Sequence, residues 1–270
     1  MHLSEINIYP VKSLKGISLN EAIIEDRGLR NDRRWMLVDD QNKFLTQREF
    51  PTMAKISIEV DGNALLAKCG EPAIDIPFDA ATNEYRTVRI WKSSVRSEVY
   101  PQAVNSWFSE ILGVDCRLVA MPEGARREID PAYAVRRFKD EVSFADGYPF
   151  MLIGQASLDD LNSRLAKPVP MNRFRPNFVV AETEPFAEDK WKVIRIGSTV
   201  FHVVKSCERC TIPTIDQVTG EKTGKEPLRT LSIYRSVRNN VLFGQNLIAE
   251  NAGENIKVGD QVKVLERDTQ

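Results

Sequence analysis

The chain has 270 residues, and its 37 Lys and Arg almost balance its 38 Asp and Glu. A net charge of −1 excludes an overall basic field that would attract nucleic acid, and only two His exclude a multi-histidine metal site within one chain. No stretch approaches the roughly 18 to 20 apolar residues of a membrane-spanning helix, and the first residues carry no signal-peptide pattern. We therefore expect a cytoplasmic protein with reduced cysteines and no membrane partner.

Most of the predicted elements are short strands. Three segments instead have helical periodicity: 104–112, which Gly113 ends; 157–165, where Ser157 begins a capping-box-like sequence; and a shorter one at 227–235. In chain order, the predicted strands span residues 3–9, 35–39, 53–60, 64–68, 88–91, 114–119, 178–181, 193–196, 200–204, 256–258 and 261–265.

The order of these elements predicts the fold class. Many short strands with few helices favour an α+β protein that is rich in β-barrel sheets. Residues 121–131 combine Pro, Gly and charged residues without apolar periodicity, which is typical of a boundary between domains. We therefore expect an N-terminal β-barrel domain at 1–120 and a second β-barrel domain with a few helices at 121–270.

A Lys and a Ser follow the first predicted strand, in the sequence YPVKSLKG at residues 9–16. The Lys12 ammonium, the Ser13 hydroxyl and the backbone amides of such a turn can contact an anionic ligand. No glycine run precedes the Lys, so this is not a Walker P-loop. A solvated turn without a ligand is the alternative.

Three Arg lie within five positions just before the apolar strand 35–39. They put at least one guanidinium at the edge of that strand, and side-chain alternation means that Arg33 and Arg34 cannot face the same side. The alternative is a surface ion pair with Asp32, which would contribute little to stability.

Another Arg is followed two residues later by an Asn, in NRFRPNF at residues 172–178. Pro176 keeps Arg175 out of the helical region, and an extended segment would place Arg175 and Asn177 on the same side. An Arg and an Asn that converge in this way suit a phosphate or a fused heterocycle.

The sequence CERC at 207–210 is the last candidate. A structural zinc site would need a second ligand pair, and Cys69 and Cys116 are isolated from each other. A thioredoxin-like pair would open a helix, against which Pro213 argues. Two interpretations remain open: half-buried thiols in a loop, or one thiolate that ligates a metal-bearing cofactor and is favoured by the neighbouring Arg209.

Together these segments resemble the MOSC family of molybdenum-cofactor proteins. The resemblance is to its two-part members, in which a MOSC-associated β-barrel domain precedes the MOSC domain, such as the mitochondrial amidoxime-reducing component and its bacterial relatives. It covers nearly the whole chain, through IYPVKSLKG (8–16), GLRNDRRWMLV (28–38), FADGYPFMLI (144–153), SLDDLNSRL (157–165), NRFRPNFVV (172–180), CERCTIPTIDQVTG (207–220), EPLRTL (226–231), LFGQNLI (242–248) and IKVGDQVKVL (256–265).

The resemblance implies that the chain binds the molybdenum cofactor, Mo-molybdopterin. It makes Cys210 the metal ligand and the catalytic residue, whereas Cys207 would support the loop. An anionic cofactor that brings most of its own metal ligands agrees with the cationic side chains and with the scarcity of His. The implied cofactor-binding residues are Lys12, Ser13, Arg33, Asp146, Gly147, Arg175, Asn177, Arg209 and Cys210.

The resemblance also implies a molybdenum-dependent oxidoreductase. Its substrates would be amidoximes, hydroxylamines and N-hydroxylated bases, reduced by oxygen-atom abstraction at molybdenum. The sequence contains no C-x₄-C-x₂-C iron–sulfur motif, so we expect the electrons to come from a separate ferredoxin, cytochrome b5-like protein or flavin reductase. Sulfur transfer through a cysteine persulfide and a carrier module that only binds the cofactor stay open as alternatives.

Overall fold

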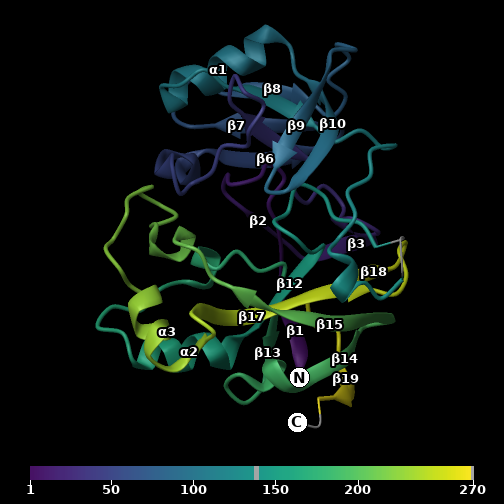
Figure 1. Cartoon of the computed structure of the whole chain (residues 1–270), viewed down its shortest axis with the longest axis vertical. Helices are drawn as coiled ribbons and strands as arrows, with labels where there is room; N and C mark the ends of the chain where they lie inside the picture. The colour runs from purple at the N-terminus through teal and green to yellow at the C-terminus, as the bar shows by residue number, and fades with distance from the viewer. Residues whose placement is uncertain (137–139, 269–270) are drawn as a thin grey trace.

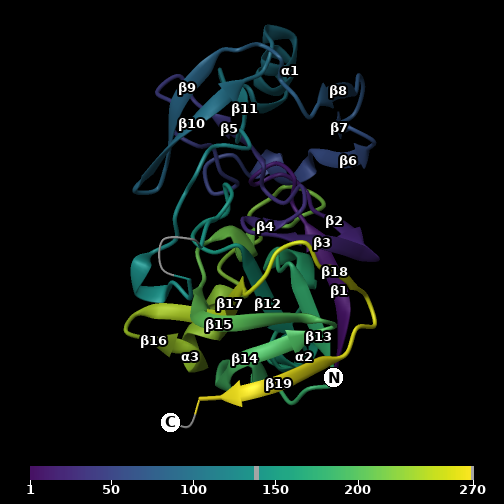
Figure 2. The ribbon, with the colours of Figure 1, turned by 90° about the vertical axis from the view of Figure 1, so that its right-hand side faces the viewer.

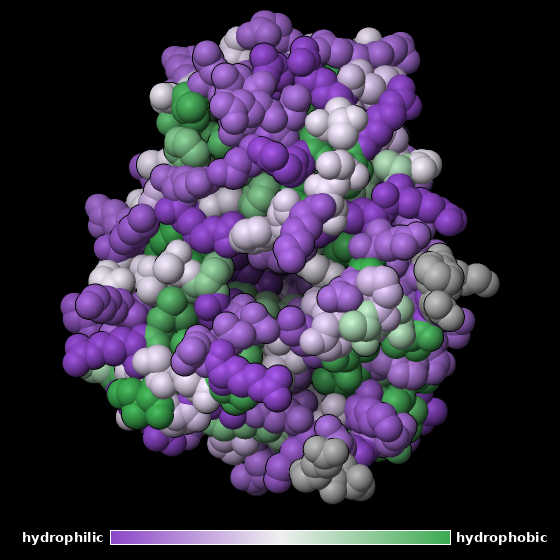
Figure 3. Space-filling view, in the orientation of Figure 1, coloured by the Kyte–Doolittle hydropathy of each residue, from purple (hydrophilic) through white to green (hydrophobic). Residues whose placement is uncertain are grey.

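The computed structural model describes residues 1–136 and 140–268. Within these residues it has 19 strands and three α-helices, which confirms the predicted α+β class with barrel-like sheets. None of the described helices is long and apolar enough to cross a membrane. The side of the molecule shown in Figure 3 is mostly hydrophilic, with hydrophobic side chains in small separate groups. The helices are α1 (Gln102–Leu112), α2 (Gln155–Ser163) and α3 (Leu228–Tyr234).

The largest sheet has nine strands and fills the lower part of the view in Figure 1. Its order is β19-β14-β15-β17-β12-β13-β1-β2, and β16 pairs with β17 off this path. Phe150, Phe178 and Phe201 pack together in its core, with ring centroids 5.4 to 5.6 Å apart. The strands are β1 (His2–Ile8), β2 (Ile17–Leu19), β12 (Phe150–Gly154), β13 (Phe178–Ala181), β14 (Trp191–Ile196), β15 (Thr199–Glu208), β16 (Ser236–Val237), β17 (Asn240–Ala249) and β19 (Val262–Arg267).

The first strand of the chain lies inside this sheet, among strands from the second half of the sequence. It pairs antiparallel with β13, where Ile6 is opposite Phe178, and also with β2. Its buried Leu3, Ile6 and Ile8 belong to the same core as the three phenylalanines. Figure 2 shows β1 in purple beside these later elements. The sheet is therefore complete only when segments more than 170 positions apart have met.

Three smaller sheets complete the fold. A four-stranded sheet has the order β5-β11-β10-β9, and two three-stranded sheets have the orders β6-β7-β8 and β18-β3-β4. Helix α1 buries Val104, Trp107 and Phe108 in the core of the upper part. The strands are β3 (Glu21–Glu25), β4 (Gly28–Leu29), β5 (Trp35–Val38), β6 (Ser57–Asp61), β7 (Ala64–Lys68), β8 (Ile74–Pro77), β9 (Tyr85–Ile90), β10 (Ser93–Val99), β11 (Arg117–Ala120) and β18 (Asn255–Lys257).

The predicted elements agree with the structure where neighbouring residues determine the conformation. They differ where residues far away in the sequence determine it. Gly113 ends α1 in a left-handed conformation, as predicted. Ser157 does not cap α2, because it lies inside the helix and its hydroxyl donates to Glu188 at 2.7 Å. The predicted strand 53–60 begins instead as a 3-10 helix, Pro51–Lys55. Both strands predicted near the end of the chain are present, and β18 pairs with β3 while β19 pairs with β14.

Candidate functional site

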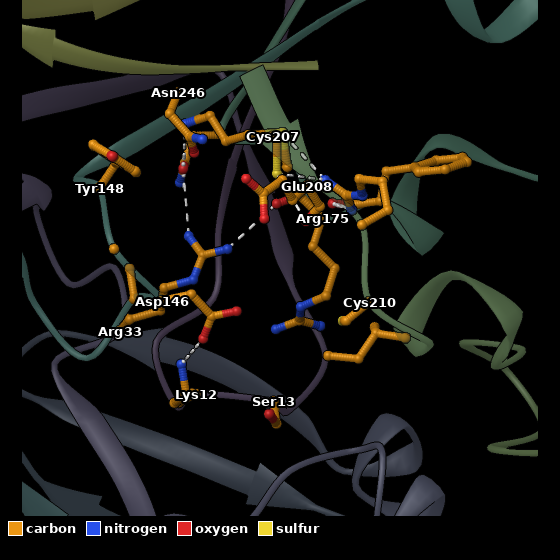
Figure 4. Close-up of a pocket in the computed structure, with 17 residues that line it drawn as sticks. Lys12, Ser13, Arg33, Asp146, Tyr148, Arg175, Cys207, Glu208, Cys210 and Asn246 are labelled. Atoms are coloured by element: carbon orange, nitrogen blue, oxygen red, sulfur yellow. Dashed lines mark hydrogen bonds and ion pairs between the residues drawn. The ribbon is translucent and has the colours of Figure 1, made fainter. Parts of the chain in front are cut away.

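One narrow cavity, of about 120 Å³, is lined by every residue that the family resemblance assigns to cofactor binding. Six separate segments of the chain contribute to it, so the structure brings together residues that are scattered over 200 positions (Figure 4). What these residues bind stays a prediction, but their convergence is a property of the fold. The predicted residues that line the cavity are Lys12, Ser13, Arg33, Asp146, Gly147, Arg175, Asn177, Arg209 and Cys210.

The Lys12 ammonium is buried in the wall of this cavity and is paired with a carboxylate. Its Nζ donates to Asp146 Oδ1 at 2.5 Å and to the Phe144 carbonyl at 2.8 Å. Burial lowers the pKa of Lys12 to about 8, although Asp146 acts in the opposite direction. Partial desolvation raises the pKa of Asp146, whose side chain is 59% exposed, but the ion pair with Lys12 lowers it by more, to below its usual range. Asp146 is therefore ionised at neutral pH and is not a proton donor.

A buried tyrosine ring supports two guanidinium groups. The guanidinium carbons of Arg33 and Arg175 lie 4.5 and 4.1 Å from the centroid of the Tyr9 ring. Arg33 Nη1 also donates to Asp32 at 2.6 Å, and the fully buried Asp32 carboxylate accepts from the Tyr9 amide at 2.8 Å. The expected alternative, an Asp32–Arg pair on the surface, is therefore wrong, because the pair is buried. Tyr9 and Asp32 were not predicted as site residues, although Tyr9 lies in YPVKSLKG and Asp32 in the arginine-rich segment before strand β5.

Arg175 differs from Arg33 because nothing in the described part of the chain neutralises it. No acceptor within these residues bonds its guanidinium, and the buried Nη2 has no partner. Figure 4 shows the side chain reaching into the cavity without a dashed line to any residue drawn. Burial and the nearby Arg33 lower the pKa of Arg175 to about 10, so it remains charged at neutral pH. A buried charge without a partner is costly, and an anionic ligand would remove that cost.

Three residues of the cavity have a left-handed backbone, with φ of 68° at Ser13, 51° at Arg33 and 58° at Arg175. Such values are uncommon outside glycine, and they cluster at functional sites. The expectation of an extended backbone at Arg175 is therefore wrong. Asn177 still lines the cavity, but protein groups use its amide: Oδ1 accepts from Arg33 at 3.3 Å, and Nδ2 donates to the Asn7 carbonyl at 3.1 Å.

The two cysteines of the CERC sequence have different surroundings. Cys210 lines the cavity just beyond the end of β15, and no described residue hydrogen-bonds its sulfur. Arg209 Nη1 instead donates to the sulfur of Cys207 at 3.0 Å, while Nη2 donates to the Phe174 carbonyl at 2.6 Å. Residues two apart at the end of a strand face the same side, which explains the pairing. The expectation that Arg209 serves the thiol of Cys210 therefore needs correction.

Two long-range contacts hold the loops of the cavity, and neither was predicted. Arg127 is buried and donates to the backbone carbonyls of Ser143, Ala145 and Asp146. The side-chain amides of Gln47 and Gln217 bond each other at 3.0 and 3.2 Å, and Gln47 also donates to the Ser13 carbonyl at 2.8 Å. Nothing local in the sequence distinguishes these residues from exposed ones.

The chemistry of the cavity favours an anionic group that contains a soft metal. Four cationic side chains line it, against the carboxylates of Asp146 and Glu208. Across residues 1–136 and 140–268, no group of three or more His, Cys, Asp and Glu could hold a metal ion. A metal that brings most of its own ligands would need only one further ligand from the protein, such as the thiolate of Cys210.

Comparison with known protein families gives two matches. Residues 1–115 match the family described as "MOSC N-terminal beta barrel domain", and residues 139–263 match the family described as "MOSC domain".

Similar proteins are found along nearly the whole chain. The chain is 34% identical to mitochondrial amidoxime-reducing component 1 of Homo sapiens, over 97% of this chain and 82% of that protein. It is 35% identical to mitochondrial amidoxime reducing component 2 of Rattus norvegicus, over 96% and 82%. It is also 31% identical to the molybdenum cofactor sulfurase of Oryza sativa subsp. japonica, over 97% of this chain but 35% of that larger protein.

Proposed function

Because the chain belongs to the MOSC family, with a MOSC N-terminal beta barrel domain before its MOSC domain, we propose that it is a molybdenum cofactor-dependent reductase of N-hydroxylated compounds. The observation that carries the proposal is that one cavity contains Cys210 and the Arg175 guanidinium, which no described residue bonds. A soft sulfur donor and a cation without a counter-ion suit a group with a metal and a phosphate. The names of the relatives, which refer to amidoxime reduction and to the molybdenum cofactor, support the same function.

The residues of the cavity fit Mo-molybdopterin. Cys210 would give its thiolate to the metal, and Lys12, Arg33 and Arg175 would neutralise the anionic pterin. When bound, the cofactor supplies two-electron oxygen-atom transfer chemistry. Arg209 would act indirectly, because its guanidinium already bonds Cys207 and the Phe174 carbonyl.

The side chains of the chain bind and position the reactants. The fixed set of Tyr9, Asp32 and Arg33 keeps one wall rigid, and Lys12 remains a cation at neutral pH beside the ionised Asp146. Overall, an N-hydroxylated compound takes up two electrons and two protons and leaves as the reduced nitrogen compound and water. The electrons would come from a separate redox protein, such as a ferredoxin, a cytochrome b5-like protein or a flavin reductase.

The metal and pterin content of protein from a cofactor-producing host tests this proposal. We expect about one molybdenum per chain in the wild type, at least tenfold less in Cys210→Ala, and nearly the wild-type content in the matched control Cys207→Ala. The loaded wild type should reduce benzamidoxime with reduced methyl viologen as the electron donor. Equal molybdenum in wild type and Cys210→Ala contradicts the ligand assignment. A wild type that holds the full molybdenum content but does not reduce benzamidoxime contradicts the proposed reductase activity and favours a carrier module.

Sulfur transfer is the second candidate, because Arg209 places a cation 3.0 Å from the sulfur of Cys207. In protein without molybdenum, a tryptic peptide that is heavier by one sulfur atom would favour it, either residues 206–209 with Cys207 or residues 210–222 with Cys210. Loss of that added mass in Cys207→Ala would assign the persulfide to Cys207.

A further inference from the structure

Trp91 is an exposed aromatic residue in a strained turn. With Lys92 it forms the two-residue connection between β9 and β10, where Ile90 pairs with Ser93. Its φ is 53°, a conformation that such turns usually give to Asn or Gly. Its surface is 47% exposed, whereas Trp35, Trp107 and Trp191 are at most 9% exposed. Strain and exposure together at a large aromatic residue indicate a role other than core packing.

Three contacts fix the orientation of this indole ring. Its Nε1 donates to Asp146 Oδ1 at 3.1 Å, the same carboxylate oxygen that accepts from Lys12. The guanidinium of Arg48 lies 4.6 Å from the ring centroid, and the ring of Phe44 lies 5.1 Å away. The indole is therefore held in place before any ligand arrives, which lowers the entropy cost of binding to it.

A second, wider cavity is lined in part by Trp91 and adjoins the narrow one. Its volume is about 730 Å³, and Trp91 and Tyr148 are aromatic residues in its lining. The two cavities share Asp146, Gly147 and Tyr148. A small molecule in the wide cavity thus lies beside the indole and adjoins the cavity that contains Cys210.

We propose that Trp91 forms a stacking wall at the substrate entrance and favours planar, conjugated N-hydroxylated compounds over aliphatic ones. The inference rests on the proposed function and adds a substrate class to it. A flat π-system such as an aryl amidoxime or an N-hydroxylated base gains by stacking on an indole. An aliphatic hydroxylamine has no such face and gains little.

Fluorescence tests the wall without a loaded cofactor. Trp91 is the only Trp of the four that is appreciably exposed, so quenching by benzamidoxime reports on it. We expect saturable quenching in the wild type and its loss in Trp91→Phe. The matched control is Tyr85→Ala, on the same hairpin, because Tyr85 is also exposed and carries Arg96 3.9 Å from its ring centroid. Quenching that remains in Trp91→Phe, or that does not saturate, contradicts the proposal that planar compounds stack on Trp91.

Kinetics of the loaded enzyme test the selectivity. The ratio of kcat/KM for benzamidoxime to that for N-methylhydroxylamine should fall about tenfold in Trp91→Ala and about twofold in Trp91→Phe, which retains a ring but loses the bond to Asp146. Tyr85→Ala should keep the wild-type ratio. An unchanged ratio in Trp91→Ala overturns the proposal, and an effect confined to the KM of a protein electron donor would assign Trp91 to donor docking instead. A wild type that reduces neither compound refutes the proposed function, while the fluorescence titration still decides on the wall.

Discussion

The two arginines that flank Tyr9 differ in how the protein neutralises them. Arg33 has the buried Asp32 as its partner and also bonds Asn177, whereas Arg175 bonds none of the described residues through its guanidinium. The cysteines repeat this contrast, because Arg209 bonds the sulfur of Cys207 and no residue in the described part of the chain bonds that of Cys210. The difference teaches that partners such as Asp32 and Arg209 hold the walls of the cavity, whereas Arg175 and Cys210 are the groups whose bonding a ligand would complete.

The largest effect is expected when the buried Asp32–Arg33 ion pair is broken. Asp32→Asn removes the charge that compensates the buried Arg33, so the free energy of unfolding should fall by about 3 to 5 kcal/mol. Urea unfolding of the cofactor-free protein measures it. The exposed neighbour Asp40→Asn is the control and should change stability by less than about 0.5 kcal/mol. A loss below about 1 kcal/mol in Asp32→Asn would mean that Arg33 does not need its partner.

Replacing Arg175 should not lower the free energy of unfolding, in contrast to breaking the Asp32–Arg33 pair. Arg175→Met should leave the free energy of unfolding of the cofactor-free protein unchanged or raise it by up to about 1 kcal/mol, because a buried, unpaired charge disappears. The same variant should retain at least tenfold less pterin after dialysis, since one charge-assisted contact is lost. Arg33→Met should instead destabilise the protein. Equal destabilisation by both variants would remove the distinction between the two arginines.

The smallest effect is a pH dependence from Lys12, whose pKa is about 8. An anionic ligand binds more tightly when the ammonium of Lys12 is charged, so above pH 8 Lys12 must take up a proton on binding. The affinity for the ligand should therefore fall by up to about tenfold per pH unit above that pH. Without a ligand, the unfolded chain holds this proton up to a pKa of 10.5, so the contribution of Lys12 to stability rises between about pH 8 and 10.5. Pterin retention between pH 7 and 9.5 measures the first effect. In Lys12→Arg, pterin retention should not change with pH over this range. A pH dependence equal to that of the wild type would mean that another group causes it.

The sequence predicted which residues meet in the cavity better than how each one is held. Lys12, Arg175 and Cys210 lie in sequences that the family resemblance places at one site, and the fold brings them to one cavity. The left-handed backbone of Arg175 and the bond from Arg209 to Cys207 could not be foreseen, because both depend on segments that only the folded chain brings together.

The same limit explains the errors in the fold. Gly113 ended its helix as expected, because the signal lies in the neighbouring residues. Ser157 resembled a cap, but its hydroxyl bonds Glu188, which is 31 positions away. The division at residue 120 stays a prediction. The pairing of β1 with β13 could not be inferred, because the hydrophobic periodicity of a segment predicts a strand but does not identify the strand with which it pairs.

The position of β1 also has a consequence for synthesis on the ribosome. At about 5 to 20 residues per second, the first strand waits roughly 10 to 35 s before β13 has been translated. During this interval the apolar side chains of Leu3, Ile6 and Ile8 lack the partners that bury them in the folded protein. An unpaired apolar strand invites pairing with other nascent chains. The yield of this protein in cells should therefore depend on translation speed and on chaperones that bind its first residues.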